Sequence, residues 1–108
     1  MTVNDLLKCG DFSSAVTPDP DREISGVYIG DLLSWVMGRA KSGDAWITIM
    51  SNVNVLAVAT LTDCACVILS EGVELSEEIL ETAKQKQINI IYTSKSSYEA
   101  AIALNQII

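Results

Sequence analysis

The amino-acid sequence predicts an α/β fold: a single compact domain over residues 1–108, with a mainly parallel central sheet of about four strands and helices on both faces. Three observations lead to this prediction. From Gly26 to Asn54 a strand, a helix and a second strand follow one another, which is the order that makes a parallel sheet. Cys64 to Leu69 is almost continuously apolar, as expected for a strand covered on both faces. A chain of 108 residues with 49% hydrophobic content can bury one core.

The amino-terminal part begins with a short helix and continues irregularly. Thr2 and Asp5 have the spacing of a capping box, and Gly10 is suited to end the helix. Pro18 and Pro20 predict an irregular connection over residues 11–22, preceded by a short edge strand at 13–16.

The next segment is predicted to form a strand, a helix and a strand. Residues 24–29 form the first strand, and Asp31 caps the helix that follows. Gly43 ends this connection, and residues 45–49 form the second strand. The apolar face of the helix is expected to consist of Leu32, Leu33, Val36, Met37 and Ala40.

Residues 52–61 are so apolar and β-branched that periodicity alone does not separate helix from strand. We interpret them as a helix, because parallel neighbours need a crossover of helical length. Ser76 then caps a helix with acidic residues in its first turn and lysines in its last, which suits the helix dipole. Residues 88–92 form the final strand, and Ser96 with Glu99 opens the last helix.

Composition excludes several classes of function. Seven Lys and Arg against 14 Asp and Glu give a net charge of −7, which disfavours a nucleic-acid partner. The chain has no histidine, so the usual general base and the commonest metal ligand are missing. Neither a signal peptide nor a membrane span is apparent, so we expect a cytoplasmic protein without membrane contact. The three cysteines are expected as reduced thiols.

The residues also resemble a known family. VYIGDLLSWVMGRAKSGDAWITIMSNVNVLAVATLTDCACVILSEG, followed by a helix and INIIYTS, is similar to stand-alone proteins of the DRTGG-domain family. Domains of this family occur beside CBS domains in regulated pyrophosphatases and in some phosphotransacetylases, and they are related to the amino-terminal domain of HPr kinase/phosphorylase. The resemblance implies a regulatory or dimer-forming role. Similar small proteins occur in anaerobes, some near iron-only hydrogenase genes.

The naming motif of that family is only partly present. Asp21-Arg22-Glu23-Ile24-Ser25-Gly26 stands where the family has Asp-Arg-Thr-Gly-Gly, so the leading pair and one glycine correspond. We favour a structural turn in which Arg22 pairs with a carboxylate over a ligand-binding motif. Gly38 to Gly43 is not a phosphate-binding P-loop, because Asp44 and Ala45 replace the required Lys and Ser or Thr and the segment precedes a strand.

Two polar turns form the candidate binding site. Each follows a predicted strand and opens a helix, so parallel strands would place both turns at the same edge of the sheet. Helix-start amides, hydroxyls and one lysine are suited to an anionic ligand such as a nucleotide phosphate. The alternative is that the polar residues are ordinary helix caps. The candidate ligand-binding residues are Thr48, Ser51, Asn52, Thr93, Ser94, Lys95 and Ser96.

Cysteines and tryptophans offer two further candidates. Cys64 and Cys66 alternate in a predicted strand and are expected on one face as small buried hydrophobes, with metal binding that recruits Cys9 as the alternative. Trp35 lies off the main apolar stripe of its helix and is expected at a homodimer interface.

We therefore expect a non-catalytic regulatory or protein-interaction module that forms a homodimer. The alternative is a sensor that binds a nucleotide or another phosphate-bearing ligand at the carboxyl edge of the sheet. A third hypothesis is an accessory protein of iron-only hydrogenase metabolism with cysteine-linked metal chemistry. We predict no catalytic residue, no cofactor and no resident metal.

Overall fold

The computed structural model describes all 108 residues and contains one five-stranded sheet with the strand order β1-β5-β4-β3-β2. The four strands β2 to β5 pair in parallel, and β1 adds to β5 in the antiparallel direction. The prediction of a mainly parallel α/β fold is confirmed, and the fifth strand is the short edge strand expected at 13–16. The strands are β1 (Ser13–Val16), β2 (Gly26–Ile29), β3 (Asp44–Thr48), β4 (Cys66–Leu69) and β5 (Ile90–Tyr92).

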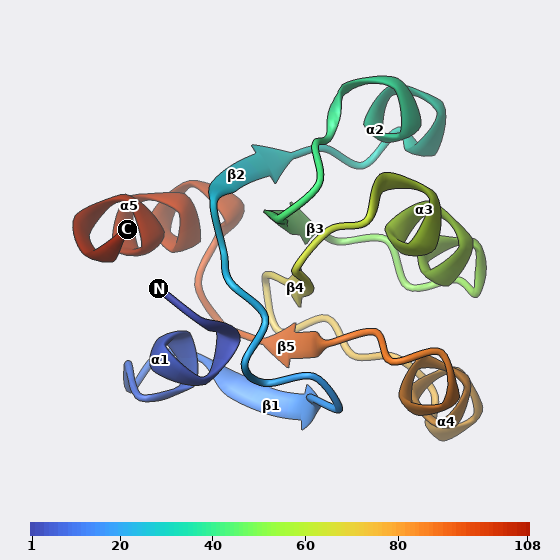
Figure 1. Cartoon of the computed structure of the whole chain (residues 1–108), viewed down its shortest axis with the longest axis horizontal. Helices are drawn as coiled ribbons and strands as arrows, with labels where there is room; N and C mark the ends of the chain where they lie inside the picture. The colour runs from blue at the N-terminus through green and yellow to red at the C-terminus, as the bar shows by residue number, and fades with distance from the viewer.

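Five helices cover the two faces of the sheet (Figure 1). The helices are α1 (Val3–Leu7) and α5 (Ser97–Ile107) on one face, and α2 (Leu33–Arg39), α3 (Asn54–Thr62) and α4 (Glu77–Gln85) on the other. The ambiguous apolar segment at 52–61 is a helix, α3, as interpreted from the sequence. No helix has the length and apolar character that a membrane span requires.

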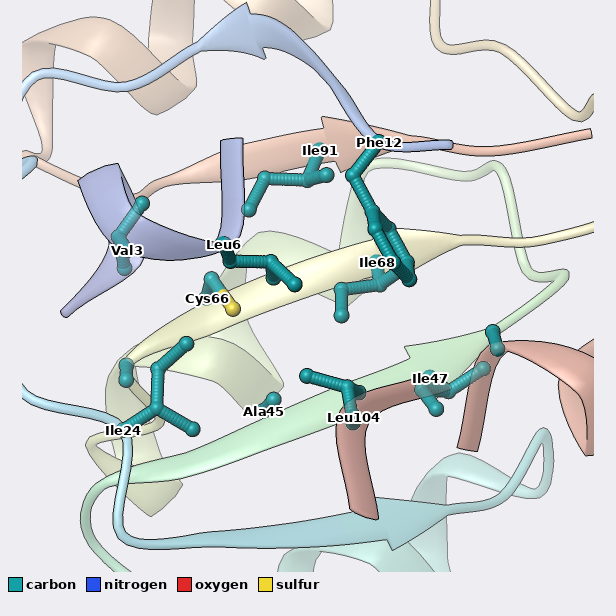
Figure 2. Packing of buried hydrophobic residues seen from close by; sticks show 12 residues of the cluster. Val3, Leu6, Phe12, Ile24, Ala45, Ile47, Cys66, Ile68, Ile91 and Leu104 are labelled. Carbon is teal, nitrogen blue, oxygen red and sulfur yellow. The ribbon is translucent and has the colours of Figure 1, made fainter. Parts of the chain in front are cut away.

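Alternation along the central strands divides the core into two layers. In β3, Ala45 and Ile47 pack under α1 and α5, whereas Trp46 packs under the other three helices. Figure 2 shows the first layer, where Leu6 of α1 and Leu104 of α5 approach Cys66 and the neighbouring strands. Every residue of β3 and β4 is buried, so these strands need a helical cover on both sides.

The helix caps agree with the sequence, whereas three strands begin two residues later than expected. Capping boxes form at Thr2 with Asp5 and at Ser96 with Glu99. β2, β4 and β5 begin at residues 26, 66 and 90. Before β4, left-handed Asp63 (φ 54°) ends α3, and the Cys64 amide still donates to Ala59 O. Because the backbone amide that follows the helix donates to a carbonyl of the last helical turn, it does not pair with a neighbouring strand, and β4 begins later.

Helix α2 buries a narrower stripe than expected. Leu33, Val36 and Ala40 face the core, but Leu32 and Met37 are 61% and 48% exposed. The reason is the position of α2 over the edge of the sheet. Because β2 is the last strand, there is no further strand against which a wider apolar face of α2 could pack.

The partial family motif lies at the amino ends of the parallel strands, where Arg22 and Asp63 join separate connections. The Arg22 guanidinium donates to both carboxylate oxygens of Asp63 at 3.0 and 3.1 Å and to the Asp63 carbonyl at 2.9 Å. Ser42 Oγ donates to the same carboxylate, and the Gly43 amide donates to the same carbonyl. The prediction that Arg22 pairs with a carboxylate is confirmed. We call Arg22, Ser42, Gly43 and Asp63 the amino-edge clasp.

Gly26, the motif's remaining glycine, allows a close approach beside this clasp. A Cβ atom on Gly26 would lie 2.6 Å from Asp44 Oδ1. Asp44 is buried and cannot easily move, because its other oxygen accepts a hydrogen bond from the Lys41 amide. Arg22 and Gly26 therefore have structural roles at this edge.

Removing Arg22 should lower stability and make it less pH-dependent. The Arg22 guanidinium, and then the Ser42 hydroxyl, hold the pKa of Asp63 below its ordinary value of 3.8. Because a lowered pKa stabilises the fold only while the carboxyl is ionised, this contribution is complete above pH 3.8 and is lost as pH falls further. We expect Arg22→Ala to cost ~1 kcal/mol at pH 7, since the Asp63 side chain is 62% exposed and screened.

The measurement is urea unfolding of wild type, Arg22→Ala and Asp63→Asn between pH 7 and pH 2.5. The difference between wild type and Asp63→Asn should shrink below pH 3.8. Arg39→Ala, which removes the other arginine, should change stability little. Equal curves at pH 7 would contradict the role of the clasp.

Two glycines give a matched test of close packing. We expect Gly26→Ala to destabilise the protein by about 1–3 kcal/mol, because the new methyl group meets a fixed carboxylate. Gly38→Ala, within α2 and facing open space, should instead be neutral or stabilising by about 0.5–1 kcal/mol. Thermal unfolding of both variants compares them, and loss of stability in Gly38→Ala alone would reverse the assignment.

Candidate functional site

The two candidate turns lie at the same edge of the sheet but are not neighbours. β3 and β5 both run parallel to β4, so both end at the carboxyl edge. β4 separates them, and its own turn comes between. The turn after β5 is joined to that intervening turn, because the Glu71 amide donates to Lys95 O and the Gly72 amide donates to Thr93 O.

The turn after β3 is occupied by a carboxylate of the chain itself. Asp31 Oδ1 accepts hydrogen bonds from the Thr48 hydroxyl at 2.8 Å and from the Ile49 amide at 2.9 Å. The expectation that Asp31 caps α2 is wrong, because Leu32 is the N-cap residue and has no side-chain cap bond. Asn52 Oδ1 accepts from the Asn54 amide, and Ser51 is exposed. Asp31 thus supplies the negative charge that an anion would bring to this turn.

The turn after β5 is also largely satisfied from within, but it retains a lysine. Thr93 is buried, and its hydroxyl accepts from the Lys95 amide. Ser96 accepts from the Glu99 amide in the capping box, while Ser94 is exposed. The Lys95 ammonium lies 3.5 Å from an Asp11 carboxylate oxygen, and its side chain is 28% exposed.

A cavity of about 330 Å³ lies beside this second turn. Three connections surround it: the start of β1, the loop after β4 and the end of β5. Thr93 and Ser94 line it, together with the carboxylate residues Asp11 and Glu74, whereas the residues of the turn after β3 do not. The cavity lining thus combines hydroxyl and carboxylate residues with apolar ones.

The sequence prediction missed Asp11, Glu74 and Tyr92, which also lines the cavity. The Tyr92 hydroxyl accepts a hydrogen bond from the Leu75 amide at 3.0 Å and so fixes one wall. The strand predicted at 13–16 was a signal that could have found them. If that strand pairs with the last strand in the antiparallel direction, its first residues lie at the carboxyl edge of the sheet.

The thiols lie in separate environments, so the expectation that Cys64 and Cys66 share a face is wrong. Cys66 packs beneath α1 and α5, whereas Cys64 packs on the opposite face. The alternation rule fails because Cys64 precedes β4 and donates to Ala59 O at 3.7 Å instead. Burial raises the pKa of Cys64 to about 11 and also raises the pKa of Cys66. No three Cys, Asp or Glu side chains gather as a metal site.

Trp35 is 55% exposed on α2, as its position off the buried stripe predicted. The Arg39 guanidinium lies 3.9 Å from the centre of its ring. Trp46, by contrast, is fully buried, and its indole N–H donates to Gly30 O at 2.9 Å. The two tryptophans therefore divide between surface and core.

Comparison with known proteins identifies the family. The model of the DRTGG domain matches residues 18–107. A solved structure of the CBS and DRTGG domains in the regulatory region of Clostridium perfringens pyrophosphatase, complexed with the activator diadenosine tetraphosphate, is similar in fold. The TM-score is 0.72 at 19% identity, over 94% of this chain and 44% of that one, so the chain spans less than half the length of that structure. No curated protein matches the sequence. The family model covers most of the chain, and the protein belongs to the DRTGG domain family.

Proposed function

We propose that this DRTGG domain is a non-catalytic regulatory module that acts through contact between two copies of the chain. Family membership and the likeness to a regulatory region of a pyrophosphatase support the regulatory part. The non-catalytic part is supported by the chemistry of the polar groups. The chain has no histidine, and burial keeps the Cys64 and Cys66 thiols protonated. The hydroxyls of Thr48 and Ser96 accept hydrogen bonds from backbone amides.

The observation that carries the homodimer is an exposed stripe on α2. Leu32 and Trp35 are 61% and 55% exposed and lie one helical turn apart. Arg39, one turn further, places its guanidinium 3.9 Å from the centre of the Trp35 ring, so a cation–π contact adds an arginine to the stripe. Exposed aromatic side chains flanked by arginine are the residues that most often dominate binding energy at interfaces.

Trp35→Ala tests this proposal directly. We expect wild type to dimerise and the variant to raise the dimer dissociation constant at least about tenfold, because truncation of an interface anchor typically costs ~2 kcal/mol or more. Sedimentation equilibrium over a range of concentrations measures both constants.

The matched control is Tyr98→Ala. Tyr98 is 73% exposed but lies at the start of α5, near the carboxyl edge of the sheet. It should leave the dissociation constant unchanged. A wild-type protein that stays monomeric at millimolar concentration would contradict the proposal.

The cavity beside β5 favours a second candidate function, a sensor for a nucleotide or another phosphate-bearing ligand. Its volume of about 330 Å³ lies at the lower end of the range for small-molecule sites. Asp11 and Glu74 are suited to accept hydrogen bonds from sugar hydroxyls, while Lys95 and the start of α5 are suited to a phosphate group. The ligand-binding residues of this proposal are Thr93 and Ser94, which line the cavity, and Lys95 and Ser96, which follow them in the same turn. Thr48, Ser51 and Asn52 belong to the other turn and do not line the cavity.

A thermal-shift screen with adenine and guanine nucleotides, coenzyme derivatives and phosphosugars tests the sensor. A ligand at 100 times its dissociation constant should stabilise the protein by about 2.7 kcal/mol. Lys95→Ala should abolish the shift, whereas Lys41→Ala, at the opposite edge, should retain it. Flat curves across the panel would count against the sensor and leave the homodimer proposal intact.

A further inference from the structure

An uncharged groove of about 560 Å³ runs along the free side of β2 and beneath the end of α5. Figure 1 shows β2 at one end of the sheet, with α5 and α2 on its opposite sides. The groove is unlike the cavity at the carboxyl edge, because no charged side chain lines it. Its lining residues are Gly26, Val27, Tyr28, Ile29, Ala101, Asn105 and Ile108.

The two edges of the sheet are protected very differently. β1 is irregular, with a shift in register between Ser14 and Val16, and two prolines follow it. Bulges and prolines prevent an edge strand from pairing with another strand. β2 pairs only with β3 and has none of these features, since neither its own residues nor the flanking Ser25 and Gly30 carry a charge or a proline. Its outward backbone groups are thus available to a further strand.

Charge favours this end of the molecule for contact between copies. With a net charge of −7, two copies repel one another over much of their surface. No charged side chain lines the groove beside β2, so the groove itself adds no like-charge repulsion between two copies that meet there.

We propose that β2 pairs with β2 of a second copy in the antiparallel direction, so that two sheets join into one. This inference rests on the proposed homodimer and identifies its interface. Val27 packs on the α5 side and Tyr28 on the α2 side. Opposed residues of paired strands point to the same face. The twofold axis therefore passes through Val27 or Tyr28. An axis between these two residues would set Val27 opposite Tyr28 and place apolar side chains on the wrong face.

A second copy explains the exposed residues beside β2 better than an extended peptide does. Two short strands alone fall well below the roughly 800 Å² per partner of a stable interface. A twofold axis at β2 also brings the α2 helices together on one face and the α5 ends on the other. The exposed Trp35 and Ile108, both more than half exposed, then contact the partner, whereas a peptide strand would leave Trp35 uncovered.

Charge insertion at β2 tests the interface. Ile29 is 47% exposed, so Ile29→Lys should fold normally and raise the dimer dissociation constant at least about tenfold. Leu61→Lys makes the same charge change at a residue of α3 that is 72% exposed, and it should leave the constant unchanged. An Ile29→Lys protein that dimerises like wild type would overturn the proposal.

Hydrogen exchange on the unmodified protein provides a test that needs no variant. Amide exchange at residues 26–29 should slow as protein concentration rises through the dissociation constant, while exchange in β4 stays constant. A dimer whose β2 exchange does not depend on concentration would overturn this interface but leave the proposed homodimer standing. A chain that is monomeric at every concentration would overturn both.

Discussion

The burial of β3 and β4 on both faces is the constraint on which the rest of the structure depends. Each side chain of these strands enters one of two apolar layers, and neither layer is complete without helices. The α2, α3 and α4 connections cover one face as right-handed crossovers require, which leaves the other face to the two ends of the chain. Leu6 of α1 and Leu104 of α5 are fully buried there, so the termini are part of the core.

Much of the fold could be predicted from the sequence because its signals are local. Continuous apolar runs indicated parallel strands, and Ser76, Ser96 and Thr2 marked helix starts through bonds made within three residues. Errors arose where distant contacts decide. The role of Asp31 depends on Thr48 of the neighbouring strand, and Cys64 leaves the sheet because Asp63 is fixed in a left-handed turn by Arg22. The sequence placed both candidate turns at one edge of the sheet but not the strand that separates them, since strand order is not written in any single segment.

The amino ends and the carboxyl ends of the parallel strands differ in structure. At the amino ends of the strands, Arg22 is bonded to Asp63 and Gly26 lies against Asp44, so these two motif residues have contacts within the chain. At the carboxyl edge, parallel strands end in turns whose backbone groups are joined pairwise, and an open space remains only where antiparallel β1 begins. The edge strand thus creates the cavity that four parallel strands alone would not have.

Electrostatics limits what such a cavity can bind in so acidic a chain. Asp11 and Glu74 repel a free phosphate, while Lys95 is already paired with Asp11 at 3.5 Å. A bare anion would have to break that pair and approach two carboxylates, so inorganic phosphate is a poor ligand on physical grounds. In the proposed sensor, a molecule with both hydroxyl groups and a phosphate would meet the acceptors of the cavity wall and, beside the cavity, Lys95. In the proposed sensor, the arrangement of charges would therefore select a ligand by the hydrogen-bond donors that it presents as well as by its negative charge.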